Sequence, residues 1–261
     1  HRGDATVNRI NAAFERAKSA EGVRMNINKW NPSDIWMIRS DYDFKCIDDE
    51  KTLLGLNQCI QDQLQQGKLI GISLKKMQSG ASLSSKNVFG DMKVNKTYAG
   101  YEYSGKSIDG YIKLSGGTKI QFRSFGAGAG LTGFQGEVKG ANANQGKIGL
   151  GPLNMILRAH GISQVSTNAA NRVTSNPDAV FNEIALGLKK YARLSQKQIE
   201  ELKENEKIVT PKFLYSKLQI TELINIIESI RNKKVRDQLV EDIYLYASSQ
   251  SRFSSAYYKL E

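Results

Sequence analysis

Apolar residues at helical spacing predict two helices in the first quarter of the chain. Residues 4–21 place apolar side chains every three or four positions, as in an amphipathic helix. Residues 52–66 repeat this pattern and end at Gly67, a typical residue after a helix C-terminus. We therefore expect both segments to pack one apolar face against a core.

The C-terminal part of the sequence is dominated by helix signals. Asn176 and Thr210 are each followed by proline, and Ser195 is followed three residues later by glutamine, all of which are typical of helix starts. Apolar residues then recur at helical spacing, so we expect a helical region over residues 176–249. The closing segment, residues 251–259, alternates aromatic and small residues and is predicted to return as a strand.

The middle of the chain shows strand patterns instead. Residues 35–38 and 69–74 are short apolar runs, and the first of them follows a proline that disfavours helix. Residues 111–114 and 119–125 flank the turn sequence Ser-Gly-Gly-Thr, which is the best hairpin signal in the sequence.

These patterns predict an α/β (α+β) fold with a central mixed β-sheet, flanking helices and a helical C-terminal region. We expect two domains. Residues 1–175 would form a basic α/β domain, and residues 176–261 would form a helical region packed on it. The length of 261 residues suits this division.

Positive charge is concentrated in the middle of the sequence. Between Lys68 and Arg158 there are thirteen lysines and arginines and four acids, so this span carries nine of the eleven net positive charges. Such a field favours polyanions through release of their counterions. A basic but merely solvated surface is the alternative. Nucleic acid, DNA above all, is therefore the expected partner.

Cysteine and histidine contents exclude several kinds of site. The two cysteines, Cys46 and Cys59, are too few for a disulfide scaffold and are expected to be reduced thiols in a cytosolic protein. With His1 and His160 as its histidines, the chain nearly excludes a Cys/His metal site, and His160 is expected to end a helix. No apolar run is long enough to span a membrane, so we expect no membrane partner.

Residues 119–149 hold the densest set of candidate functional residues. An alternating run leads into a glycine-rich loop, and Gln135, Glu137 and Lys139 follow at strand spacing, which places them on one face. The loop matches neither the Walker nor the dinucleotide-binding pattern. In residues 78–107, tyrosines interleaved with lysines suit either stacking on bases or an ordinary exposed loop.

Two short motifs resemble a known family. Pro32-Ser33-Asp34 followed by Glu137-Val138-Lys139 resembles the PD-(D/E)XK nuclease superfamily, which has the restriction-endonuclease-like fold. In that family an aspartate on one strand and an (Asp/Glu)-x-Lys on the next surround a metal. Ser73-Leu74-Lys75 is a rival second motif with serine in place of the acid. NPSDIWMI, LIGISLKK, IQFRSF and FQGEVKG also resemble blocks in proteins of large tailed phages.

The resemblance implies a phage-encoded, metal-dependent nuclease that hydrolyses phosphodiester bonds of DNA, in the cytoplasm of an infected host cell or in a virion. Asp34 and Glu137 would hold Mg²⁺ or Mn²⁺, and Lys139, with Lys75, would position the attacking water. The residues expected to contact nucleic acid are Gln135, Arg123, Lys113, Lys119, Lys76 and Lys147.

Other interpretations of the same residues stay open. The protein could be a non-catalytic DNA-binding protein or a structural virion protein on a nuclease-like fold. Glu137 and Lys139 could form a surface ion pair of little energetic value. Asp34 could be a turn residue that caps the start of its strand.

Overall fold

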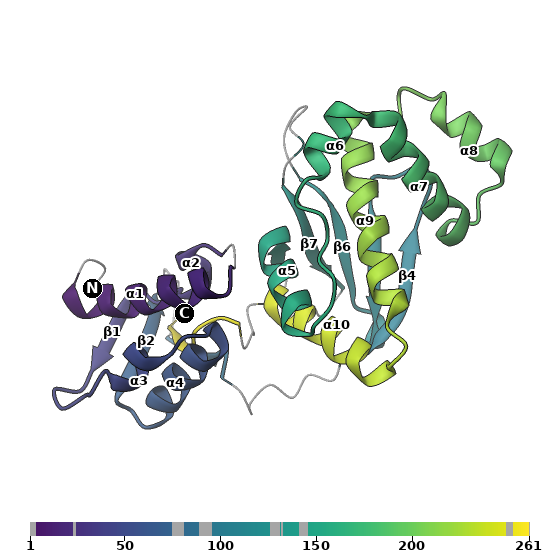
Figure 1. Ribbon diagram of the computed structural model, residues 1–261. Coiled ribbons are helices and arrows are strands. Elements are labelled where there is room, and N and C mark those ends of the chain that lie inside the picture. The colour runs from purple at the N-terminus through teal and green to yellow at the C-terminus, as the bar shows by residue number, and fades with distance from the viewer. Residues whose placement is uncertain are drawn as a thin grey trace. The chain divides into compact units, whose positions relative to one another are not determined.

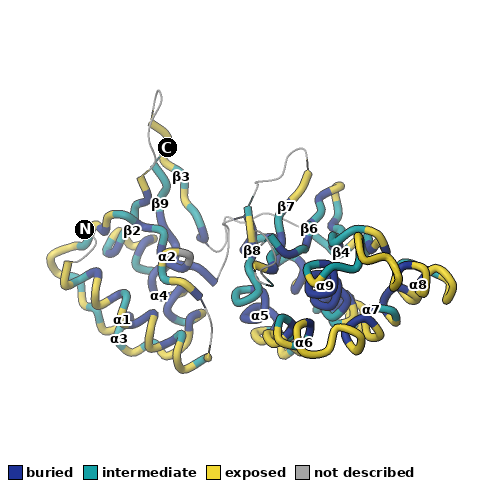
Figure 2. Tube along the Cα trace, turned by 90° about the horizontal axis from the view of Figure 1, so that it is seen from above, coloured by how far each residue is buried: buried dark blue, intermediate teal, exposed yellow. Residues whose placement is uncertain are grey.

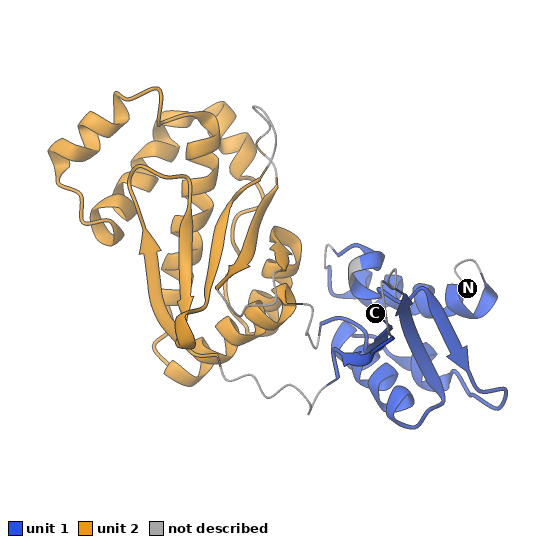
Figure 3. Cartoon of the chain, turned by 180° about the vertical axis from the view of Figure 1, so that it is seen from behind, with its two compact units in different colours: residues 1–94, 249–261 blue, residues 95–248 orange. Residues whose placement is uncertain are grey.

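The chain folds into two compact units. The computed structural model describes residues 4–22, 25–74, 81–88, 96–125, 131, 133–140, 146–248 and 253–260 (Figure 1). Unit 1 comprises residues 1–94 and 249–261, and unit 2 comprises residues 95–248 (Figure 3). The α+β class is confirmed. The domain boundaries differ from the expected division at residues 175 and 176, because the C-terminal helices belong to the same unit as the strands of residues 98–149.

Unit 1 is a small sheet packed with helices. Its sheet has the strand order β1-β2-β9-β3, in which β1 and β3 run antiparallel to their neighbours and β9 runs parallel to β2. The elements are α1 (Ala5–Ala20), α2 (Ile27–Trp30), β1 (Ile35–Ile38), α3 (Lys45–Asp49), α4 (Leu53–Gln65), β2 (Leu69–Leu74), β3 (Leu83–Lys86) and β9 (Tyr257–Leu260). The predicted return of the C-terminal segment as a strand is confirmed.

The core of unit 1 follows from the amphipathic helices. Asp4 caps α1 by accepting a hydrogen bond from the Thr6 N–H, and the apolar face of α1 is buried. Phe14 of α1 stacks on Trp30, with ring centroids 4.6 Å apart. The indole N–H of Trp30 donates to Asn57 Oδ1 of α4 at 2.6 Å, so the buried polar atom is satisfied.

A disulfide joins Cys46 of α3 to Cys59 of α4. This corrects the expectation of two reduced thiols. The two α-carbons lie 6.1 Å apart, within the range that a disulfide spans. The sequence alone could not show this, because a separation of 13 residues says nothing about how two helices pack.

Unit 2 is an antiparallel five-stranded sheet with helices on one face. The strands follow one another in the order β4-β5-β6-β7-β8. Instead of one central mixed sheet the protein therefore has two sheets, and the mixed one is in unit 1. The elements of unit 2 are β4 (Tyr98–Tyr103), β5 (Gly110–Leu114), η1 (Ser115–Gly117), β6 (Lys119–Ser124), β7 (Phe134–Lys139), β8 (Lys147–Gly149), α5 (Leu150–Ala159), α6 (Ala169–Ser175), α7 (Pro177–Tyr191), α8 (Gln196–Lys203), α9 (Pro211–Ser229) and α10 (Lys233–Ala247).

The predicted local signals of unit 2 are confirmed. The hairpin of β5 and β6 turns at Ser115–Gly117, where Gly116 and Gly117 adopt positive φ angles that suit glycine. Asn176 caps α7, and Ser195 forms a capping box at α8. His160 follows the last residue of α5, as expected, and its Nε2 lies 2.7 Å from Asp242 Oδ2 of α10.

Helix α9 is the main cover of the sheet. Figure 1 shows α9 and α10 in front of the strands, and Figure 3 shows the strands from the opposite side. Helix α9 is buried along most of its length, whereas α8 is largely exposed (Figure 2). The hydroxyl of Ser216 accepts from the Ser124 N–H at 2.9 Å, which ties α9 to β6. Close packing requires glycine at position 110, where a β-carbon would meet Ile220 at 2.4 Å.

Candidate nucleic-acid interface

One face of the β4–β8 sheet carries a dense set of charged and polar side chains. Every second residue of β5, β6 and β7 is buried against the helices, and the residues between them point to the other side. We call this second side the charged face. Its members are Glu102, Tyr111, Lys113, Lys119, Gln121, Arg123, Gln135, Glu137, Lys139 and Lys147. Every site residue predicted within unit 2 therefore lies on this face.

Three lysines form a row across the charged face. Lys113 lies opposite Lys119, and Lys119 lies opposite Lys139, so the row crosses β5, β6 and β7. Like charges directly opposite each other in a sheet are destabilising. Glu102 offsets part of this repulsion, since its Oε1 lies 2.7 Å from the Lys119 ammonium and 3.9 Å from that of Lys113.

Glu137 lies between two ammonium groups. Its Oε2 is 2.8 Å from Lys139 Nζ, and its Oε1 is 2.8 Å from Lys147 Nζ on the neighbouring strand. Burial raises the pKa of the Glu137 carboxyl, but the hydrogen bonds and charges of the two lysines outweigh it and hold this pKa below its usual value. The carboxylate is thus ionised and paired, as the ion-pair interpretation of Glu137 and Lys139 expected.

Arg123 presents a partly exposed guanidinium on the charged face. Its guanidinium lies 3.5 Å from the Asp109 carboxylate and stacks on the Phe125 ring, 4.6 Å from the centroid. Its Nε is buried and has no hydrogen-bond partner within the described part of the chain. The exposed part of this guanidinium is held in place by Phe125 and Asp109, so it is pre-organised to bind an anionic oxygen.

Asp34 belongs to unit 1, whereas the charged face belongs to unit 2. Its backbone N–H donates to Ile72 O at 2.8 Å, and its Oδ2 accepts from the Leu74 N–H at 2.9 Å. The Ser73 hydroxyl is 3.4 Å from the same oxygen. The carboxylate therefore lies beside the end of β2, where the rival motif Ser73-Leu74-Lys75 begins. Lys75 and Lys76 themselves lie outside the described residues.

The expected metal pair does not come together within one unit, because Asp34 belongs to unit 1 and Glu137 to unit 2. Each oxygen of Glu137 already contacts an ammonium group, and a field of lysines opposes a divalent cation. Beside Asp34, position 73 supplies a hydroxyl in place of a second carboxylate. No group of three or more His, Cys, Asp or Glu able to hold a metal occurs among the described residues. The donor sets therefore fit Mg²⁺ poorly.

Some residues near these sites have no obvious sequence signal. Lys259 of β9 lies opposite Ser73 in the parallel register, and Glu102 joins the charged face through the pairing of β4 with β5. Pairing partners cannot be derived from spacing along the chain. Lys217 of α9 is different, because it interrupts an apolar stripe and is fully buried. Such a lysine is itself a signal.

The tyrosines of β4 do not take part in the charged face. The Tyr103 hydroxyl lies 2.7 Å from Thr221 Oγ1 of α9, and Tyr101 packs edge-on against Tyr191 of α7. The Tyr98 hydroxyl donates to Glu228, also of α9. All three rings contact helices, so their possible role in stacking on bases is not supported.

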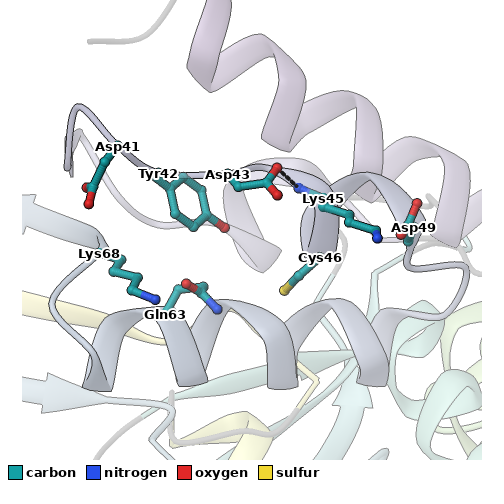
Figure 4. Close-up of a pocket in the computed structure, with 8 residues that line it drawn as sticks. All are labelled: Asp41, Tyr42, Asp43, Lys45, Cys46, Asp49, Gln63 and Lys68. Carbon is teal, nitrogen blue, oxygen red and sulfur yellow. Dashed lines mark hydrogen bonds between the residues drawn. The ribbon is translucent and has the colours of Figure 1, made fainter.

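A polar pocket of about 470 Å³ lies beside the disulfide of unit 1 (Figure 4). Its lining carries both acidic and basic side chains, namely Asp41, Asp43 and Asp49 with Lys45 and Lys68. Asp41 binds Arg39, which lowers the pKa of the carboxyl, and Asp43 accepts from the Lys45 N–H at 2.9 Å. Burial raises the pKa of Tyr42 to about 12. This balance of charges selects no class of ligand.

No protein-family model, curated protein or solved structure matches this chain significantly. Among the described residues, no helix is both long and apolar enough to cross a bilayer.

Proposed function

We propose that unit 2 binds nucleic acid, with DNA as the first candidate, by holding the phosphate backbone on the charged face. The main observation that supports this proposal is the row of Lys113, Lys119 and Lys139 on adjacent strands. Neighbouring strands are about 4.8 Å apart, so the α-carbons of the three lysines lie within about 10 Å of one another. Clustered cations of this kind release counterions from a phosphate backbone.

The ion pairs within the charged face are compatible with this role. Exposed ion pairs contribute about 0–1 kcal/mol each, so a phosphate can displace the partly exposed Glu102 at small cost. The pairs also hold the lysine side chains in place before binding, which reduces the ordering cost. Arg123 adds a planar donor suited to phosphate oxygens.

The first test measures binding of the full chain to a DNA duplex and to its separate strands over a range of salt concentrations. Replacing Lys113, Lys119 and Lys139 by alanine should weaken binding strongly and flatten the slope of log K against log salt by up to about 3. A control with Lys189, Lys197 and Lys207 changed to alanine removes the same charge from exposed helix and loop positions. Equal loss in both variants would contradict the proposal.

A second test separates binding from metal-dependent cleavage. Glu137→Gln removes a negative charge between two lysines, so binding should tighten several-fold, whereas a metal-ligand role predicts loss of cleavage. Glu201→Gln on α8 is the matched control, because its side chain is 63% exposed and distant in sequence from the charged face. Weaker binding by Glu137→Gln would argue against the proposed role of the face.

The nuclease hypothesis keeps one specific observation in its favour. Asp34, which directly precedes β1, contacts Ser73 and Leu74 at the end of the paired strand β2, so it lies beside the first two residues of the rival motif Ser73-Leu74-Lys75. We therefore propose metal-dependent DNA cleavage as the second candidate function, centred on unit 1, in which phosphate oxygens of the DNA would have to supply the metal ligands that the described residues beside Asp34 lack. Cleavage of plasmid DNA with Mg²⁺ or Mn²⁺ that is lost in Asp34→Ala but kept in Glu137→Ala would support it. No cleavage by the native chain would exclude it.

A further inference from the structure

The width and shape of the charged face limit which nucleic acid it can hold. Its cations lie on β5, β6, β7 and β8, which together span about 14 Å at the usual spacing between strands. The major groove of a DNA duplex is about 12 Å wide and admits a helix or a two-stranded ribbon. A sheet of this width cannot enter the groove, and it meets a convex duplex along one ridge of phosphates. A single strand can lie along the whole face.

Two aromatic rings lie among the cations of the charged face. Tyr111 is on β5, and Phe125 directly follows β6, and both are partly exposed. Lys119 Nζ is 5.6 Å from the centroid of the Tyr111 ring, while the Arg123 guanidinium and Lys147 Nζ are 4.6 Å and 5.4 Å from that of Phe125. Each ring therefore has cationic groups next to it. Proteins that bind single strands combine such rings, which stack on bases, with cations that hold the backbone.

Hydrogen-bonding amides occupy the space between the rings. Gln121 lies opposite Tyr111 and donates from its Nε2 to the tyrosine hydroxyl at 3.2 Å. Gln135 lies opposite Gly149, and a β-carbon at that glycine would meet no atom of the described chain within 4 Å. The surface beside Gln135 is thus open. Carboxamides both donate and accept, so they can bond to the edges of unpaired bases.

We propose that the charged face binds single-stranded nucleic acid, with bases stacked on Tyr111 and Phe125 and phosphates held by the neighbouring lysines and Arg123. This inference rests on the proposed function and narrows it to a class of substrate. A duplex hides its base faces within the helical stack, so rings on a protein surface gain nothing from it. The rings therefore provide selectivity for unpaired bases.

The test compares fluorescence anisotropy titrations of the full chain with a single-stranded DNA oligonucleotide, an RNA of the same sequence and the matching DNA duplex at one salt concentration. We expect at least about tenfold tighter binding of a single strand than of the duplex, since each stacked base contributes about 1–3 kcal/mol. Duplex binding equal to or tighter than single-strand binding would overturn the inference while leaving the proposed function intact. No binding to any of the three would overturn both.

Two variants test whether Tyr111 and Phe125 cause the preference for single strands over the duplex. Tyr111→Leu and Phe125→Leu keep an apolar side chain but remove the flat ring, and each should weaken single-strand binding about tenfold while duplex binding stays unchanged. Tyr258→Leu, in unit 1, is the control and should change neither. If the ring variants bind single strands as tightly as the native chain does, the stacking assignment is wrong. A thermal melt of each variant checks that it is folded, and the comparison on the native chain needs no variant.

Discussion

The two sheets bury one face each, but their other faces have opposite chemistry. In unit 2 the second face carries lysines, arginine and acids in paired rows. In unit 1 the strand register places apolar residues on the corresponding face, and four of these are more than a third exposed. They are Ile35 at 39%, Met37 at 56%, Leu74 at 44% and Leu83 at 61% exposure.

Alternation of buried and exposed residues along a strand therefore does not by itself show which kind of partner the exposed face of a sheet can bind. Both sheets alternate buried and exposed positions, yet the exposed positions of unit 2 suit a charged partner and those of unit 1 do not. An exposed apolar face is a feature of interaction surfaces. We propose nucleic-acid binding for unit 2 because the exposed face of its sheet is charged, whereas that of unit 1 is apolar.

The largest change in unfolding free energy is expected on the buried side of the unit 2 sheet, compared with its charged face. Phe122 is 1% exposed and stacks on Phe134, whereas its neighbour Gln121 belongs to the charged face. Phe122→Ala should lower the unfolding free energy by about 3–5 kcal/mol because it leaves a cavity under the helices. Gln121→Ala should change it by less than about 0.5 kcal/mol. Urea denaturation measures both, and similar losses would mean that the charged face is also packed.

The next largest change in stability is expected on reduction of the disulfide, which should affect unit 1 but not unit 2. Reduction of the Cys46–Cys59 bond should lower the unfolding free energy of unit 1 by about 3 kcal/mol, because the unfolded chain regains the freedom of a closed loop. Unit 2 contains no cysteine and should unfold as before. Denaturation with and without dithiothreitol reports this. The Cys46→Ser/Cys59→Ser double variant should not respond to the reductant, and a shift of the unit 2 transition would contradict the separation of the units.

A smaller change in stability, which depends on pH, is expected from the buried Lys217 of α9 in unit 2. Burial lowers the pKa of Lys217 to about 7, and Asp109 opposes this only in part. Its Nζ donates to the Asp109 carbonyl at 2.9 Å and lies 4.3 Å from the Tyr103 ring centroid. Between this pKa and that of an unfolded lysine, about 10.4, the unfolded chain binds more protons, so stability rises with pH.

We therefore expect unit 2 to gain about 2 kcal/mol of unfolding free energy from about pH 7 to about pH 9. Lys217→Met should remove most of this gain, whereas Lys212→Met, on a partly exposed position of the same helix, should keep it. Denaturant midpoints at several pH values measure the slope. A native chain whose stability is flat over this range would show that Lys217 is not buried as a neutral amine.

The smallest effect on stability tests the apolar face of unit 1. Changing Met37 and Leu83 to glutamate should alter the unfolding free energy by less than about 0.5 kcal/mol each, because both side chains are already exposed. Binding of a hydrophobic fluorescent dye to the folded protein should nevertheless fall. The same changes at Lys113 and Lys139 of the charged face should leave dye binding unchanged. If the Met37 and Leu83 variants bind the dye as the native chain does, these exposed side chains do not form a continuous apolar patch.

Local structure was predictable where a few adjacent residues determine it. The caps at Asn176, Ser195 and Thr210, the β5–β6 hairpin and the shared face of Gln135, Glu137 and Lys139 follow from short patterns. These features depend on neighbours in sequence, and the structure confirms them.

Long-range organisation was not predictable from the same patterns. Nothing in the sequence around Asp34 and Glu137 indicates that they belong to different units, because motif spacing contains no information on strand pairing. The Cys46–Cys59 bond and the pairing of Lys259 with Ser73 likewise depend on packing between distant segments.

The position of β9 has a consequence for how the protein forms during synthesis. This strand lies between β2 and β3, yet it leaves the ribosome after all of unit 2. Until it emerges, β2 and β3 have open edges that can pair with other chains. Unit 2 is continuous in sequence and can fold first. Nascent chains stalled before Tyr257 should therefore expose an incomplete sheet that depends on chaperones, whereas completed chains supply the missing strand from their own C-terminal segment.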